Sequence, residues 1–171
     1  MRSGTMRSGT MRTFIVLIGL MLCAGQANAG RYLSAAGFSI KKPRGWVQSG
    51  RNAIKPRDGG AQLNIRNTGA MPLTPAAVRA IRKQLMKVYR SKFRNFHITS
   101  FGKRTFGPNR GIYVRARLRV RNIPMVMSQA FLKVRHAKRM LIVTCMVRAD
   151  KRRAHLGACE ATYRTARAGR R

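Results

Sequence analysis

The sequence predicts an α+β domain in which an antiparallel β-sheet is flanked by helices, in the order strands, helix, four strands, helix. Three observations lead to this prediction. Short alternating apolar segments separated by Gly, Pro and Asp come first, and one amphipathic helical segment follows them. Four more alternating segments with short connections then precede a second helical segment. Short connections favour antiparallel neighbours, because parallel strands need long crossovers.

The opening segments read as short strands joined by turns. Residues 37–40 (GFSI) alternate apolar and polar side chains, and the turn at 43–46 (PRGW) positions an aromatic side chain. Residues 53–56 and 61–66 flank an Asp-Gly pair, which indicates a hairpin because Gly adopts the positive φ that such turns require. Asp58 is therefore expected to have a structural role in this hairpin.

The clearest helix begins at Thr74 and Pro75 and is expected to end near Lys92. Thr caps unpaired N–H groups, and Pro at the first helical position loses no hydrogen bond. The predicted apolar stripe consists of Val78, Ile81, Leu85 and Val88. The basic side chains on the rest of this helix that could bind anions are Arg79, Arg82 and Lys83.

The second half of the chain is expected to form four strands and a helix. The strands are predicted at residues 96–104, 111–121, 125–135 and 138–147. Asp150 is predicted to cap a helix that runs to about Ala166. The inner face of that helix is expected to carry Leu156, Cys159 and Tyr163, and residues 169–171 are expected to form a loose basic tail.

Residues 1–29 are predicted to be a cleaved signal peptide. Residues 14–22 form an apolar run that is too short to span a bilayer as a helix, and Ala27-Asn28-Ala29 supplies a small-x-small cleavage pattern. The repeated MRSGT makes Met11 an alternative start, and Leu22 before Cys23 disfavours lipidation. The prediction is a single domain at residues 30–171, exported to the periplasm or secreted, with no transmembrane span after cleavage.

Removal of Cys23 with the leader would leave one pair of cysteines, Cys145 and Cys159. An oxidising compartment permits a disulfide between them. The alternative is two buried free thiols, and the sequence leaves both open.

Charge is the strongest compositional signal. The chain has 37 Lys and Arg against 3 Asp and Glu, a formal net charge of +34, and loss of residues 1–29 would remove three arginines and no acid, leaving +31. Such a surface favours anionic partners: lipid phosphates, lipopolysaccharide, an acidic protein or nucleic acid.

Catalysis is disfavoured, since acid–base and metal chemistry draw on neighbouring carboxylates and histidines. Asp58 is assigned to a turn, Asp150 to a helix cap, and Glu160 lies among arginines. The three histidines have no metal-ligand spacing and are interpreted as structural or surface residues: His97, His136 and His155. No enzyme activity, metal or cofactor is predicted.

The segment 113–121 (YVRARLRVR) carries the sharpest candidate site. In a strand, alternate side chains share a face at about 6.8 Å intervals. The arginines expected in one row are Arg115, Arg117, Arg119 and Arg121, and the core-facing residues expected between them are Val114, Ala116, Leu118 and Val120. Arginine pairs bidentately with phosphate, so the row could bind a polyanion. The alternative is a solvated strand face in a uniformly basic protein.

Aromatic side chains interleaved with cations suit single-stranded nucleic acid. The four that follow this pattern are Phe93, Phe96, Phe101 and Phe106. The preferred interpretation is that they build the core, because the domain has few other large side chains. Met125 and Met127 are likewise interpreted as packing residues.

The segment GFSIKKPRGW resembles the opening of domains in the PsbP family and in the Ran-binding nuclear import factor that shares their fold. Its most specific positions are Phe38, Pro43, Gly45 and Trp46, which are structural. The resemblance implies an antiparallel sheet flanked by helices that serves as a binding scaffold rather than an enzyme. Bacterial exported members of this kind are of unknown function.

Three functional hypotheses follow. The first is an exported, non-catalytic binding or accessory domain that acts at an anionic envelope surface or on an acidic partner. The second is an extracytoplasmic nucleic-acid-binding protein. The third is an uncharacterised structural domain whose charge reflects a bias of the whole proteome, which a comparison of isoelectric points across exported proteins of the same organism would test.

Overall fold

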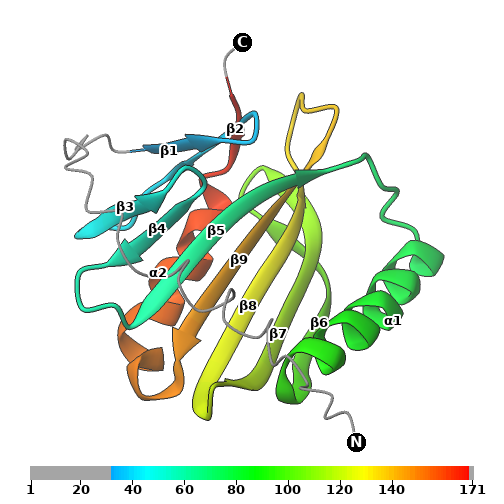
Figure 1. The fold of residues 1–171 in the computed structure, drawn as a ribbon. Helices are drawn as coiled ribbons and strands as arrows, with labels where there is room; N and C mark the ends of the chain where they lie inside the picture. Colours follow the sequence, from blue (N-terminus) through cyan, green and yellow to red (C-terminus); the bar gives the residue numbers. More distant parts are fainter. Residues whose placement is uncertain (1–31, 170–171) are drawn as a thin grey trace, which may run out of the picture.

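A computed structural model describes residues 32–169, and it confirms the predicted α+β architecture (Figure 1). The predicted signal peptide, the alternative start at Met11 and Cys23 lie outside the described residues. Within residues 32–169, no helix is long and apolar enough to cross a membrane.

Most of the domain is a seven-stranded antiparallel sheet with the strand order β3-β4-β5-β9-β8-β7-β6. Its strands are β3 (Trp46–Gly50), β4 (Ala53–Pro56), β5 (Ala61–Thr68), β6 (Arg94–Phe106), β7 (Asn109–Val120), β8 (Ile123–Lys133) and β9 (Met140–Arg148). A small three-stranded sheet has the order β1-β2-β10 and consists of β1 (Tyr32–Ala35), β2 (Phe38–Lys41) and β10 (Arg167–Ala168). Gly169, predicted in a loose tail, donates its N–H to the carbonyl of Gly37 at 2.9 Å.

The two faces of the large sheet bury separate cores because side chains alternate along each strand. Helix α1 (Pro75–Lys92) covers one face at the β6 side, and its core includes Val114, Ala116 and Leu118 of β7. Helix α2 (Arg152–Arg164) covers the other face over β8 and β9, together with the small sheet. Helix α2 contacts β6 only at its end, where Phe106 packs on Tyr163, and it leaves the first half of β6 and the far end of β7 uncovered.

Helix α1 begins as predicted. The Thr74 hydroxyl accepts a hydrogen bond from the N–H of Ala77 at 3.2 Å, and Pro75 occupies the first turn. Ile81 and Leu85 are buried, but Val88, predicted in the apolar stripe, is exposed. The inner face turns instead toward Tyr89, whose ring packs on Phe96.

The start of α2 differs from the prediction. Residues 149–151 form a 3₁₀ turn, Lys151 is the N-cap residue, and Asp150 makes no capping hydrogen bond. The carboxylate of Asp150 instead pairs with Arg148 at 2.9 Å. An exposed guanidinium two residues away therefore replaces the helix N–H groups as its partner.

The two predicted turns near the start of the chain are present. The N–H of Trp46 bonds to the carbonyl of Pro43 at 3.2 Å, Gly45 has φ +79°, and Trp46 is buried, as is Phe38. In the β4–β5 turn, Asp58 accepts a hydrogen bond from the N–H of Gly60 at 3.0 Å. Both motifs have the structural role that the sequence indicated.

Candidate functional site

The arginine row lies on β7, on the face of the sheet that also carries α2. Arg115, Arg117 and Arg119 alternate with side chains that are buried under α1, as the alternation predicted. Arg121 does not extend the row. It lies beyond the end of β7 with φ +47°, and with Asn122 at φ +67° it forms the two-residue turn into β8. Two positive φ values are typical of the tight hairpin turn that matches strand twist, so the chain turns before a fourth alternate position.

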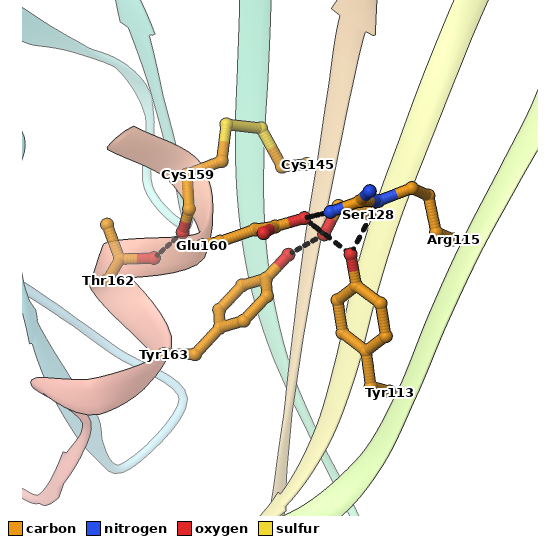
Figure 2. Close-up of a disulfide and its surroundings, with 8 residues drawn as sticks. All are labelled: Tyr113, Arg115, Ser128, Cys145, Cys159, Glu160, Thr162 and Tyr163. Carbon is orange, nitrogen blue, oxygen red and sulfur yellow. Dashed lines mark hydrogen bonds and ion pairs between the residues drawn. A yellow bond between two sulfur atoms is a disulfide. The ribbon is translucent and has the colours of Figure 1, made fainter. Parts of the chain in front are cut away.

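Arg115 is not a free cation. Its guanidinium lies 2.6 Å from the carboxylate of Glu160 on α2, and its Nε donates to the hydroxyl of Tyr113 at 2.8 Å (Figure 2). Partial burial alone would lower the pKa of Arg115, but the hydrogen bond and charge of Glu160 outweigh it, and the net effect raises that pKa. Arg115, the first residue of the predicted row, therefore stabilises the packing of α2 on the sheet in addition to contributing positive charge to the surface.

Glu160 is the centre of a polar network between α2 and the sheet. The Tyr113 hydroxyl donates a short hydrogen bond to this carboxylate, and Ser128 approaches the same oxygen at 3.3 Å. Ser128 also shares a hydrogen bond of 2.8 Å with the hydroxyl of Tyr163 (Figure 2). Burial, followed by the bond to Glu160, raises the pKa of Tyr113, and burial raises the pKa of Tyr163. Both phenols are therefore neutral donors or acceptors at physiological pH.

A disulfide fixes the helix beside this network. Cys159, directly before Glu160, is bonded to Cys145 of β9, with their Cα atoms 6.1 Å apart. This confirms the disulfide among the two alternatives that the sequence left open. Both cysteines are fully buried between α2 and the sheet, so the bond fixes the helix against β9 at this point.

An open hollow of about 850 Å³ lies where the first half of α2 meets β7. Its lining is Arg115, Ala149, Asp150, Arg152, Arg153, Leu156, Gly157 and Glu160. Glu160 is paired with Arg115 and Asp150 with Arg148, whereas Arg152 and Arg153 are exposed. Arg117 and Arg119 continue from Arg115 along the same face of β7, so the hollow and the row adjoin.

Strand β6 adds two basic side chains, Arg94 and His97, to the face of the sheet that carries the arginine row. The sequence pattern did not predict them there. Arg94 lies directly opposite Arg119, and His97 lies directly opposite Arg117, so each pair shares a face. Arg94 and His97 are three residues apart, and strict alternation would place them on opposite faces. A bulge at Asn95, which has φ +55°, brings both to the same side. The residue there is Asn, one of the few non-Gly side chains that tolerate a positive φ.

We call Arg94, Arg117, Arg119, Arg152 and Arg153 the open cationic face. Within residues 32–169, no carboxylate forms an ion pair with any of these five arginines. The three acids of the chain have other partners: Glu160 pairs with Arg115, Asp150 with Arg148, and Asp58 with His155. The open cationic face therefore presents positive charge that the domain does not neutralise.

The other predicted anion-binding candidates lie elsewhere. Arg79, Arg82 and Lys83 are exposed on α1, which packs on the opposite face of the sheet, and Arg82 lies 5.8 Å from the centre of the Phe101 ring. They therefore do not share a surface with the β7 row. The two sets can be tested separately.

The phenylalanines are core residues, in line with the preferred interpretation. Phe96 and Phe106 are buried, and Phe93 and Phe101 are half-buried against the core under α1. Met127 is buried beside them, and Met125 is half-buried. None of these side chains offers an exposed platform for stacking.

His155 has a structural role, as predicted. Its acidic partner, Asp58, is distant in the sequence and was not predicted. Its Nε2 lies 2.9 Å from the carboxylate of Asp58 in the β4–β5 turn, and the ring makes an edge contact with Trp46. The hydrogen bond from Gly60, followed by the one with His155, lowers the pKa of Asp58. Nothing in the described part of the chain groups three potential metal ligands.

Comparisons with known proteins show the fold. No protein-family model matches the sequence, and no curated protein matches it by sequence. The solution structure of cyanobacterial PsbP (CyanoP) from Synechocystis is 12% identical with a TM-score of 0.57, covering 89% of this chain and 99% of that one. The crystal structure of LpqN, involved in cell envelope biogenesis of Mycobacterium tuberculosis, is 11% identical with a TM-score of 0.54, covering 76% and 82%.

A protein of unknown function from Pseudomonas aeruginosa, PA94, is 14% identical with a TM-score of 0.50, covering 77% of this chain and 83% of that one. The chain thus has a PsbP-like fold, and the predicted fold resemblance is confirmed. At these identities the likeness concerns architecture and carries no residue roles.

Proposed function

We propose that this protein is a non-catalytic binding or accessory domain that acts outside the cytoplasm and binds an anionic partner on its open cationic face. The observation that carries the proposal is the gathering of these arginines from β6, β7 and α2, to which no carboxylate of residues 32–169 is paired. Unneutralised guanidinium groups that adjoin a hollow favour phosphate or carboxylate ligands. The candidate partners are lipid phosphates, lipopolysaccharide and an acidic envelope protein.

The extracytoplasmic location is supported by chemistry and by sequence. A disulfide between Cys145 and Cys159 persists in oxidising compartments and is rare in reducing ones. The apolar run and small-x-small pattern before Gly30 support an exported chain. The similarity in fold to LpqN, a protein involved in cell envelope biogenesis, is consistent with this location.

A binding role suits the acidic groups better than a catalytic one. Glu160 is engaged by Arg115, Tyr113 and Ser128, and these contacts hold α2 on the sheet. Asp150 and Asp58 are exposed and paired at two turns. Each of the three carboxylates thus has a structural role. General acid–base catalysis would require one of them to give up the hydrogen bonds of that role.

The test compares two variants with the same loss of charge. Arg117→Gln/Arg119→Gln removes two cations from the open cationic face, and Arg79→Gln/Arg82→Gln removes two exposed cations from α1. Binding to anionic vesicles and to long-chain polyphosphate is measured between 50 and 300 mM salt, a range chosen because exposed charges are screened beyond about 8 Å at physiological ionic strength.

We expect salt-sensitive binding to at least one probe, with the loss larger for the β7 variant. Equal losses in the two variants would show that net charge alone drives binding. Binding of neither probe would remove the proposal altogether.

A further inference from the structure

On the premise that the open cationic face binds an anion, as proposed above, we infer that its ligand is a linear phosphate-bearing polymer that lies along β7 in the step beside α2. A flat bilayer and a compact acidic protein fit this surface less well. The inference rests on the relief of the surface, the spacing of the arginines, an unfavourable charge pair and, within residues 32–169, the absence of an exposed Phe, Tyr or Trp on this face.

The relief of the surface favours a narrow ligand. Helix α2 packs over β9 and β8, reaches β7 at Tyr113 and Arg115, and leaves the second half of β7 and the first half of the edge strand β6 open on the same face (Figure 1). A helix with its side chains is about 10 Å across, so α2 stands above the exposed strands as a wall. A flat membrane resting on that face would contact α2 first, whereas a linear polymer can lie on the exposed strands beside the helix.

The spacing of the cations favours a repeating ligand. Arg117 and Arg119 lie on one face of a single strand about 6.8 Å apart, and Arg115, which is paired with Glu160, precedes them at the same interval. The row meets the hollow at Arg115, where Arg152 and Arg153 add two further guanidinium groups from α2. A polymer with regularly spaced phosphates could contact successive guanidinium groups along one line.

The pair Arg94 and Arg119 indicates that the positive charge on this face has a binding role. Arg94 and Arg119 lie directly opposite each other on neighbouring strands, both exposed. Like charges in this position destabilise an antiparallel pair. The bulge at Asn95 is what brings Arg94 onto this face. A bound phosphate between the two guanidinium groups would convert the repulsion into attraction.

The ligand is recognised through its phosphates rather than through bases. Proteins that bind single strands add aromatic side chains on which bases stack. In the described part of the chain, Tyr32 is the only exposed large aromatic, and it lies on β1 in the small sheet. Tyr113, two residues before Arg115 on β7, is buried, with Arg104 over its ring at 4.5 Å. His97 is the exposed ring opposite Arg117, and it is smaller than the aromatic side chains of such platforms.

The experiment uses three probes: long-chain polyphosphate, a single-stranded oligonucleotide of mixed sequence, and vesicles of phosphatidylglycerol and phosphatidylcholine. Each is titrated against the unmodified domain, Arg117→Gln/Arg119→Gln and the control Arg79→Gln/Arg82→Gln. Thermal unfolding of each protein is recorded at the same salt, because exposed Arg→Gln changes on β7 should leave the domain folded and slightly more stable.

We expect the β7 variant to bind polyphosphate at least tenfold more weakly than the control variant does. We expect vesicle binding to fall equally in both. Loss of two contacts should also make the logarithmic salt slope for the oligonucleotide shallower by about 1.4.

The probes separate the possible sources of the ligand. Weaker binding of both polymers by the β7 variant supports a site for phosphate chains in general, and weaker binding of polyphosphate alone assigns the site to that polymer. If the β7 variant loses vesicle binding as strongly as polymer binding, the inference is overturned while the proposed function stands. If no probe binds with salt sensitivity, the proposed function itself fails.

Discussion

Glu160→Gln offers the most direct test of how the site is built. Glu160 accepts a charge-assisted hydrogen bond from Arg115, with both side chains less than a third exposed, at 27% and 28%. Such a bond is worth about 1.5 to 3 kcal/mol, and glutamine keeps one oxygen for Tyr113. We therefore expect a loss of about 2 kcal/mol in the free energy of unfolding.

The matched control is Asp150→Asn, which also removes one acid from this basic protein. Its pair with Arg148 is about half exposed, at 55% and 49%, and such surface pairs add little to stability because water and salt screen them. Trp46, the single tryptophan and a buried one, reports unfolding by fluorescence in urea.

For a domain of this size, 2 kcal/mol lowers Tm by about 6 to 8 °C. If Glu160→Gln costs no more than Asp150→Asn, burial does not strengthen the Arg115 pair, and the network does not hold α2 on the sheet.

Three further predictions concern stability. Cys145→Ser should lower the free energy of unfolding by about 3 kcal/mol, the value for closing a loop of this length, and a reductant should then leave the variant's Tm unchanged. The lowered pKa of Asp58 means that its contribution is present above pH 3.8 and is lost as the pH falls below that value. Asp58→Asn should therefore narrow the Tm difference between pH 7 and pH 3, and an unchanged difference would contradict this. Gly111→Ala should unfold the domain, since its Cβ would lie 2.2 Å from the carbonyl oxygen of Phe131. Gly102→Ala, with open space around its Cβ, should be nearly neutral in the same urea titration.

The elements that the sequence predicted best are those encoded by local periodicity. The helix that begins at Thr74 has its predicted start and end, and β7 has the predicted alternation from Val114 to Arg119. These features depend on neighbours within a few residues, which a pattern can report. The errors lie at element ends. Asp150 was expected to cap α2 but pairs with Arg148, and Arg121 was expected in the row but forms the turn.

The candidate site was predicted only in part. Arg117 and Arg119 were identified from alternation, but Arg94 was not placed on their face. Its position depends on the bulge at Asn95 and on the pairing of β6 with β7. A register shift of one residue reverses which face a side chain occupies, so such a position cannot be read from alternation alone.

By itself, the sequence determined the order of the elements, the net positive charge of the domain and the amphipathic faces of the main helix and strand, because composition and periodicity can be read without the fold. The tertiary structure decided which cations are neutralised. Glu160 meets Arg115 from 45 residues away, and Asp58 meets His155 from 97 residues away. Only folding brings such distant groups together. Within residues 32–169, folding therefore leaves the five arginines of the open cationic face without a carboxylate partner, while the three acids stabilise the fold.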